Sequence, residues 1–211
     1  MIVIIDYGCG NLLSLKRALD EFKIPNEVSN DKTKILNAKL LILPGVGAFE
    51  NAMNLLKKND LIDIILEFTT ERKKPLIGIC LGMQILFTKS FEMGEHVGLN
   101  LIDGTVEKIN KISNNKDIKV PHISWSEIIF EKNTNYEIKF TDDLNGRSFY
   151  FVHSYMAILK KNINLVAKCK YFDIEVPAIV QKDKVVGFQF HPEKSGKNGL
   201  KLLKKTIDNL L

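Results

Sequence analysis

Apolar and polar positions in the first half of the chain follow two alternating patterns. Short apolar runs of strand length are followed by apolar side chains at the three- and four-residue spacing of a helix face. The runs predict strands over 2–6, about 27–28, 39–43 and 76–79. The helical spacing predicts helices over 12–23, about 48–57, about 60–72 and 83–87, with Asn11 or Ser14 capping the first of them. Strands that alternate with helices in this way indicate a parallel sheet covered by helices.

From about residue 98 the pattern changes to shorter segments in which apolar and polar positions alternate. Turn signals such as Asp103-Gly104 and Asn145-Gly146 separate these segments. The alternation predicts strands over 104–109, 118–122, 125–130, 148–153, 163–170, 176–181 and 185–190. We therefore expect antiparallel pairs that extend or flank the parallel sheet, and then a last helix over about 196–210. Stretches rich in lysine and asparagine predict solvated loops at 108–119 and 131–137.

Length and composition favour one ordinary globular domain over 1–211. The chain has 211 residues, of which 45% are hydrophobic and 26% charged. No apolar run approaches the roughly 18 residues needed to cross a bilayer, and the first residues read as a strand rather than a signal peptide. The net charge of +5 comes from scattered lysines without a basic stripe. We therefore expect no membrane and no nucleic acid among the partners.

Three cysteines, Cys9, Cys80 and Cys169, lie far apart and show no C-x-x-C spacing. Their odd number and wide spacing predict neither a disulfide framework nor a zinc site, so we expect no metal. A reducing, cytoplasmic setting fits this usage best.

Cys80 is the strongest candidate for a reactive group. It follows the apolar run 76–79, precedes the expected helix, and has Gly78 and Gly82 two positions away on either side. This pattern is typical of a nucleophile elbow, a sharp strand-to-helix turn that lifts a nucleophile above the sheet edge. The helix start favours a thiolate there. The alternative is a buried structural cysteine, because free cysteines are more often buried core residues than reactive groups.

A cysteine nucleophile needs a base, and His191 with Glu193 is the best pair that the chain offers. In an extended segment these two side chains face the same way, so Glu193 can orient the imidazole. His153 is the rival base, and Cys9, between Gly8 and Gly10, is the rival nucleophile. The sequence around the other two histidines indicates no catalytic role. We expect His122 in a loop or at an interface and His96 in a solvated loop.

Acyl transfer from a cysteine also needs donors for a developing oxyanion. The backbone N–H of Leu81 directly follows the candidate nucleophile. The turn at 44–47, Pro-Gly-Val-Gly, closes a neighbouring strand and can supply a second donor. An ordinary strand-to-helix turn would have the same residues.

Together these motifs resemble the class I (triad) glutamine amidotransferases. The two most specific segments are Gly-Ile-Cys-Leu-Gly-Met-Gln at 78–84 and Gln-Phe-His-Pro-Glu at 189–193. The resemblance also includes the segments 6–11, 43–47, 149–155 and 191–195, and it runs from residue 1 to the end. It implies a flavodoxin-like fold with an open, mostly parallel sheet, and it implies no cofactor.

The resemblance also implies the roles of individual residues. Cys80 would attack the side-chain amide of L-glutamine, with His191 as base and Glu193 orienting it. Gly47 and Leu81 would form the oxyanion hole. Positions that match the family's glutamine site are Gly45, Gln84, Glu92, Ser154 and Tyr155.

The closest resemblance is to members that pass ammonia to a separate HisF-type cyclase, a (β/α)8 barrel, within a heterodimer. The positions that match this interface are Asn11, Arg17, Trp125, Tyr150 and Lys194. The segment 121–126, Pro-His-Ile-Ser-Trp-Ser, departs from the usual Pro-His-Met-Gly-Trp-Asn. This departure leaves open a related barrel partner that acts on a surface-polysaccharide sugar. A non-catalytic binding protein and a cysteine peptidase are weaker alternatives.

Overall fold

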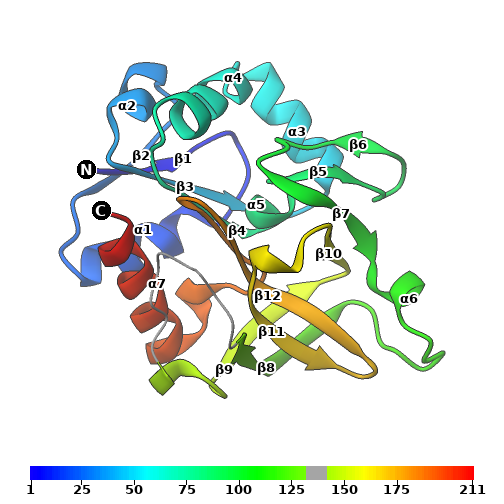
Figure 1. Ribbon diagram of the computed structural model, residues 1–211. Coiled ribbons are helices and arrows are strands. Elements are labelled where there is room, and N and C mark those ends of the chain that lie inside the picture. The colour runs from blue at the N-terminus through cyan, green and yellow to red at the C-terminus, as the bar shows by residue number, and fades with distance from the viewer. Residues whose placement is uncertain (132–141) are drawn as a thin grey trace.

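The core of the fold is a nine-stranded sheet whose first half is parallel (Figure 1). The computed structural model describes residues 1–131 and 142–211, so most of the predicted loop at 131–137 lies outside the described residues. β1 (Ile2–Ile5) lies between β2 (Asn26–Ser29) and β3 (Leu40–Gly45). β4 (Leu76–Cys80) pairs with β3, and β13 (Val185–Phe188) returns from the far end of the chain to pair with β4 in parallel.

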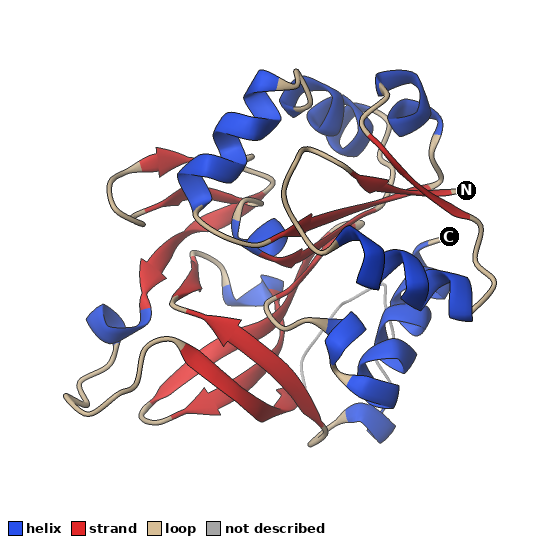
Figure 2. Ribbon diagram, turned by 180° about the vertical axis from the view of Figure 1, so that it is seen from behind, coloured by secondary structure: helices blue, strands red, loops and turns tan. Residues whose placement is uncertain are grey.

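Helices cover both faces of this parallel half (Figure 2). Successive residues of β1 point to opposite faces, so Ile2 and Ile4 belong to one apolar cluster and Val3 and Ile5 to the other. The first cluster packs against α1 (Leu12–Glu21) and α7 (Gly196–Leu210). The second packs against α2 (Lys32–Asn37), α3 (Phe49–Lys58) and α4 (Ile62–Leu66).

The second half of the chain adds antiparallel strands, as the alternating pattern predicts. β12 (Ile174–Lys182), β11 (Leu165–Tyr171), β8 (His122–Phe130) and β9 (Ser148–His153) extend the large sheet beyond β13. A separate four-stranded sheet contains β10 (Tyr155–Leu159), β7 (Ile102–Lys108), β5 (Phe87–Ser90) and β6 (His96–Val97). Short turns remain at α5 (Leu81–Gln84), α6 (Ile109–Ile112) and η1 to η4, at 67–71, 142–144, 162–164 and 192–194.

Most of the predicted strands and helices are confirmed, including the Asn11 cap, whose side chain accepts a hydrogen bond from the N–H of Ser14. The strand predicted over 125–130 is confirmed as part of β8, whereas the strand predicted over 118–122 is wrong, because β8 begins only at His122. Pro121 has no N–H to give to a strand ladder. The sequence pattern missed α2, β5, β6 and β10.

The helix predicted over 83–87 is also wrong, because α5 ends at Gln84 and Phe87 already belongs to β5. The carbonyl oxygens of Ile85 and Leu86 accept hydrogen bonds from the N–H groups of Leu99 and Leu101. These long-range bonds take the acceptors that a continuing helix would need. The elbow is therefore followed by a single helical turn.

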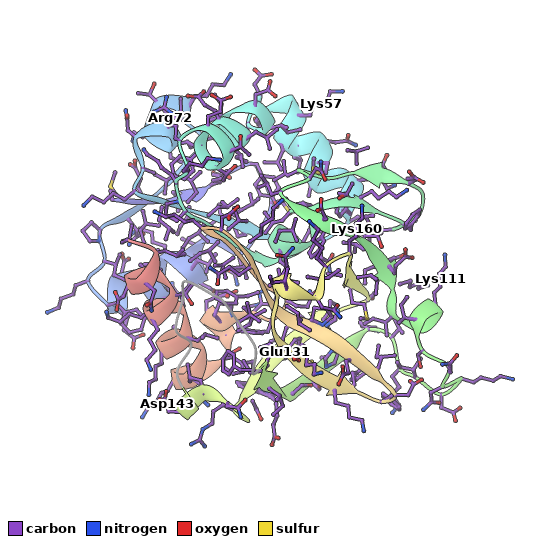
Figure 3. All side chains as sticks on the ribbon, viewed as in Figure 1. Lys57, Arg72, Lys111, Glu131, Asp143 and Lys160 are labelled. Carbon is purple, nitrogen blue, oxygen red and sulfur yellow. The ribbon has the colours of Figure 1, made fainter. Side chains whose placement is uncertain are left out.

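Charged side chains lie at separate points on the outside of the molecule, as Lys57, Arg72 and Lys111 show in Figure 3. They come from α3, from the turn after η1 and from α6. Within 1–131 and 142–211, no helix is long and apolar enough to span a bilayer.

The backbone of α5 packs directly against the backbone of β3 and β4, with no side chain between them. A Cβ atom on Gly82 would lie 1.8 Å from the carbonyl oxygen of Leu43, and one on Gly78 would lie 2.6 Å from the carbonyl oxygen of Gly82. Real Cβ atoms do not approach so closely, so only glycine fits at either position. The two glycines predicted to flank an elbow are therefore required by packing.

Gly82→Ala is expected to lower the free energy of unfolding by an amount at or above the upper end of the usual overpacking cost of about 1–3 kcal/mol. The clashing neighbour is buried backbone, which cannot move aside. Gly146→Ala is the control, because a Cβ atom on Gly146 would have nothing within 4 Å and its cost comes only from the positive φ of +72°. The control should cost about 1 kcal/mol. Urea unfolding of both variants checks this, and equal midpoints would contradict the packing argument.

Candidate active site

Cys80 stands at the sharp turn where β4 ends and α5 begins. Its φ of +55° is unusual for a residue with a side chain and is held by the tight packing around it. The residue is buried, with 7% of its surface exposed, and its sulfur reaches a cavity. Because α5 is a single turn, the predicted help from a helix dipole is small here. Stabilisation of a thiolate must come from side chains.

His191 and Glu193 form a buried pair beside this sulfur. Nδ1 of His191 lies 2.9 Å from Oε1 of Glu193, and the two side chains are 3% and 2% exposed. The predicted contact is present but its predicted cause is wrong, because 192–194 is a 3-10 turn rather than extended backbone. Pro192 opens that turn and brings Glu193 back under the imidazole.

The imidazole of His191 holds its proton more tightly than an ordinary histidine. Burial alone would lower the pKa of His191, but its hydrogen bonds with Cys80 and Glu193 outweigh burial and raise the pKa to about 10. At neutral pH His191 is therefore positively charged, with a sulfur on one side and a carboxylate on the other. This is the charge pattern that stabilises a thiolate.

A cavity of about 360 Å³ opens over the sulfur. Sequence-predicted residues that line it, in addition to Cys80 and His191, are Gly47, Leu81, Gln84, Glu92, Ser154 and Tyr155. Gly45 lies opposite Cys80 in the pairing of β3 with β4, and a Cβ on it would lie 2.8 Å from the N of Gly82. Glu92 Oε2 accepts a hydrogen bond of 2.7 Å from the N–H of Phe49.

The rival base, His153, also lines the cavity but both of its ring nitrogens are occupied. Nδ1 lies 2.8 Å from the carbonyl oxygen of Tyr155, and Nε2 lies 3.0 Å from Nδ1 of His122. Burial lowers the pKa of His153 to about 3 and that of His122 to about 4, so both rings are neutral. The rival nucleophile, Cys9, faces the carbonyl oxygen of Val46 instead of an acid–base pair.

Two expectations for the other histidines are wrong. His122 is fully buried in β8, where its ring stacks on Phe151 and Tyr171 at centroid distances of 5.0 and 3.9 Å. It is therefore part of the core rather than a loop or surface residue. His96 belongs to β6, has only 18% of its side chain exposed, and lies 3.9 Å from a carboxylate oxygen of Glu50.

Gln189 is a polar residue to which sequence reasoning gave no role. It is fully buried, its Nε2 faces the sulfur of Cys80 at 4.0 Å, and its Oε1 accepts a hydrogen bond of 3.1 Å from Gln84. Gln84 Nε2 also donates to the carbonyl oxygen of Tyr155. The signal was present in the sequence, because a glutamine two positions before His191 interrupts an otherwise apolar strand end.

The positions predicted to face a partner come from three parts of the fold. Trp125 and Tyr150 are paired across β8 and β9, with ring centroids 6.0 Å apart. Asn11 caps α1, Arg17 is exposed on α1, and Lys194 is exposed in η4. Tyr150 connects this face to the site, because its carbonyl oxygen accepts a hydrogen bond from the N–H of His191.

The arrangement can perform nucleophilic acyl transfer. It combines a sulfur, a positively charged imidazole oriented by a buried carboxylate, and two residues of the same cavity, Gly47 and Leu81, whose backbone N–H groups are candidate oxyanion donors. Within 1–131 and 142–211 no cluster of three or more His, Cys, Asp or Glu side chains is placed to hold a metal ion. The cavity is of a size for a small polar substrate.

Comparison with known proteins identifies close relatives. The family model for "Glutamine amidotransferase class-I" matches residues 3–210. The imidazole glycerol phosphate synthase subunit HisH of Geobacillus thermodenitrificans is 40% identical over 208 residues, covering 98% of this chain and 95% of the relative. The HisH subunit of Streptococcus mutans is 42% identical over 209 residues, covering 99% of this chain and 98% of the relative.

Solved structures share the fold. A crystal structure described as a glutamine amidotransferase superposes with a TM-score of 0.73 at 20% identity, covering 100% of this chain and 99% of the other. A structure of PurLQS from Thermotoga maritima gives a TM-score of 0.71 at 20% identity, covering 100% and 98% of the two chains. The expected open α/β fold with a mostly parallel N-terminal sheet is confirmed.

Glu193→Gln is expected to lower the pKa of His191 by about one pH unit or more, because it removes the negative charge beside Nδ1. The imidazolium then loses its proton at a lower pH than in the unaltered protein. Nuclear magnetic resonance titration of nitrogen-labelled histidine rings measures this. Glu175→Gln, which removes an exposed carboxylate paired with Lys168, is the control and should leave the titration of His191 unchanged. An unchanged pKa in the Glu193 variant would contradict the electrostatic account.

Proposed function

This chain belongs to the class-I glutamine amidotransferases, and on that premise we propose that it is the glutaminase subunit of an imidazole glycerol phosphate synthase. In that role it hydrolyses L-glutamine to glutamate and ammonia. The observation that carries the proposal is that Cys80 and His191 line one cavity while Glu193 lies 2.9 Å from the imidazole of His191. Relatives named as HisH subunits match over nearly the full chain and support the same role.

In the first half of the reaction, the Cys80 thiolate attacks the carbon of the glutamine side-chain amide. The carbonyl oxygen becomes an oxyanion, and the N–H groups of Gly47 and Leu81 stabilise its charge. The His191 imidazolium then gives its proton to the leaving nitrogen, which departs as ammonia. A glutamyl thioester on Cys80 and a neutral imidazole remain.

In the second half, His191 takes a proton from a water molecule that attacks the thioester carbon. The carbon–sulfur bond breaks, glutamate leaves, and the thiolate–imidazolium pair is restored. Glu193 orients the imidazole and stabilises its charged form in both halves. Both steps therefore use the same three side chains.

The cavity lining suits the amino-acid end of glutamine. Glu92 is the acidic side chain of that lining, so we propose that it binds the substrate ammonium group. Gln84, Ser154 and Tyr155 line the same cavity and hold the rest of the substrate, with Gly45 supporting the wall from β3. No cofactor takes part in these steps.

Ammonia leaves for a HisF-type cyclase barrel bound to this chain in a heterodimer. There it joins the activated ribonucleotide PRFAR to form imidazole glycerol phosphate and AICAR, a step of histidine biosynthesis. The proposed interface holds Asn11, Arg17, Trp125, Tyr150 and Lys194. In its support, Trp125 and Ile123 lie on the same face of β8 and are each 56% exposed, so two large apolar side chains stand next to each other on this surface. Three free cysteines favour a cytoplasmic setting for this complex. We also propose that residues 1–211 act as one domain.

The departure at 121–126 favours one second candidate function. In it, this chain supplies ammonia to a related barrel that aminates or amidates a surface-polysaccharide sugar. Ser124 and Ser126 stand in that segment, and both hydroxyls lie within 3.0 Å of Nε2 of His122. Mixing the chain with an authentic HisF subunit, glutamine and PRFAR separates the candidates. The proposal expects glutamine-dependent formation of imidazole glycerol phosphate. Glutamine hydrolysis without that product would favour the second candidate.

Cys80→Ala in the complex with HisF is expected to abolish glutamine-dependent synthesis, a loss of at least about 10⁴-fold in kcat, because no nucleophile remains. Synthesis from added ammonium should continue, because the cyclase needs only ammonia. Cys169→Ala is the matched control, since Cys169 is a second buried cysteine, in β11, and does not line the cavity. Rates of product formation with each nitrogen source check this. Retained glutaminase activity in the Cys80 variant would refute the assignment.

A further inference from the structure

We infer that a chain of hydrogen bonds through His122 and His153 fixes one wall of the glutamine cavity, with both rings carrying their proton on Nδ1. The two histidines occupy paired positions of β8 and β9. Ser124 and Ser126 supply the donor at the far end of the chain. All four are positioning residues, because they act through the wall. The inference rests on the proposed glutaminase function and deepens it.

The wall lies at the junction of the two sheets. Ser154 and Tyr155 line the cavity where the chain passes from β9 in the large sheet to β10, the end strand of the small sheet. The carbonyl oxygen of Tyr155 accepts hydrogen bonds from Gln84 Nε2 at 2.9 Å and from His153 Nδ1 at 2.8 Å. A carbonyl oxygen has two lone pairs, so these bonds use both. They attach the wall to α5 and to β9.

The Tyr155 carbonyl group determines where the proton lies on the first ring. A carbonyl oxygen can only accept, so Nδ1 of His153 carries the proton and donates it. Burial lowers the pKa of both His153 and His122, so each ring is neutral and holds one proton. Nε2 of His153 is therefore an acceptor. Its partner at 3.0 Å, Nδ1 of His122, must be the donor.

The two serines complete the chain. Because Nδ1 of His122 holds the one proton of the ring, Nε2 is an acceptor that needs a donor. The hydroxyls of Ser124 and Ser126 lie 2.9 and 3.0 Å from this atom and 2.7 Å from each other. Either hydroxyl can donate to the ring while the other donates to its neighbour. His122 is fully buried, and a buried acceptor without a donor is costly, so the pair of hydroxyls stabilises this order of protons.

Nuclear magnetic resonance of nitrogen-labelled histidine rings tests the order of protons in the unaltered chain. At neutral pH we expect His122 and His153 each to be neutral with the proton on Nδ1. Substitution of each histidine removes one ring signal and so assigns it. A proton on Nε2 of either ring, or a charged ring, would overturn the inference. This measurement needs neither a partner subunit nor catalysis, so its failure is distinct from failure of the proposed function.

Two substitutions of His153, in the complex with the HisF subunit, test the effect on the wall. Leucine removes the donor to the Tyr155 carbonyl group, whereas asparagine keeps an N–H close to the place of Nδ1. We expect His153→Leu to raise KM for glutamine about fivefold, the effect of one ordinary hydrogen bond. The change in kcat should be smaller, because the wall binds substrate and transition state alike. His153→Asn should return KM to within about twofold of the unaltered complex. A lower kcat with unchanged KM would make His153 the base and overturn the inference.

The serine pair provides a test that holds even if His153→Leu does not fold. Ser124→Val with Ser126→Val and Ser124→Thr with Ser126→Thr give side chains of nearly the same shape that differ only in the hydroxyl. The valine pair should raise KM for glutamine about threefold or more, and the threonine pair should stay within about twofold of the unaltered complex. Equal KM values in the two pairs would overturn the inference. An unaltered complex that cannot hydrolyse glutamine would overturn the proposed function and the effect on substrate, whereas the order of protons is decided by the spectra alone.

Discussion

The contact between bare backbone of α5 and β3 is the constraint on which the site depends. Gly82 packs against the carbonyl group of Leu43 so closely that no side chain fits between them. This contact places the turn of Cys80 at the carboxyl end of β4 and holds the residue at a positive φ. A strained backbone conformation of this kind persists only where the surrounding packing holds it in place. The sulfur therefore has one position relative to the neighbouring strands.

The sheet topology brings the rest of the machinery to that sulfur. β13 comes from the far end of the chain, yet it pairs with β4 in parallel, so His191 just beyond β13 and Cys80 at the end of β4 lie at the same sheet edge. β3 ends at the same edge on the other side of β4 and carries Gly45 and Gly47. Open parallel sheets commonly place their sites at the carboxyl ends of the strands for this reason. The hydrogen bonds of His191 with Cys80 and Glu193 then raise its pKa and keep the imidazole charged, although burial alone would lower that pKa.

Much of this could be predicted from sequence because it rests on local patterns. The glycines around Cys80, the parallel strands and the final helix each have a periodic or spacing signal, and the His191–Glu193 contact has one too. The His191–Glu193 contact was predicted from extended backbone, yet the structure makes it through a 3-10 turn, so the prediction was right for the wrong reason. Features set by distant contacts could not be foreseen. The early end of α5, the burial of His122 between rings, and the contact of Gln189 with the sulfur all depend on residues far along the chain.

Covalent labelling with a diazoketone analogue of glutamine tests the central claim most directly, since the reagent enters as substrate and alkylates the nucleophile it meets. The complex with HisF would be inactivated with the analogue and then digested, and each cysteine-containing peptide examined by mass spectrometry. The account predicts one adduct, on Cys80, that grows in step with the loss of glutaminase activity and is prevented by excess glutamine. Inactivation with the adduct on Cys9, on Cys169 or on another residue would contradict it.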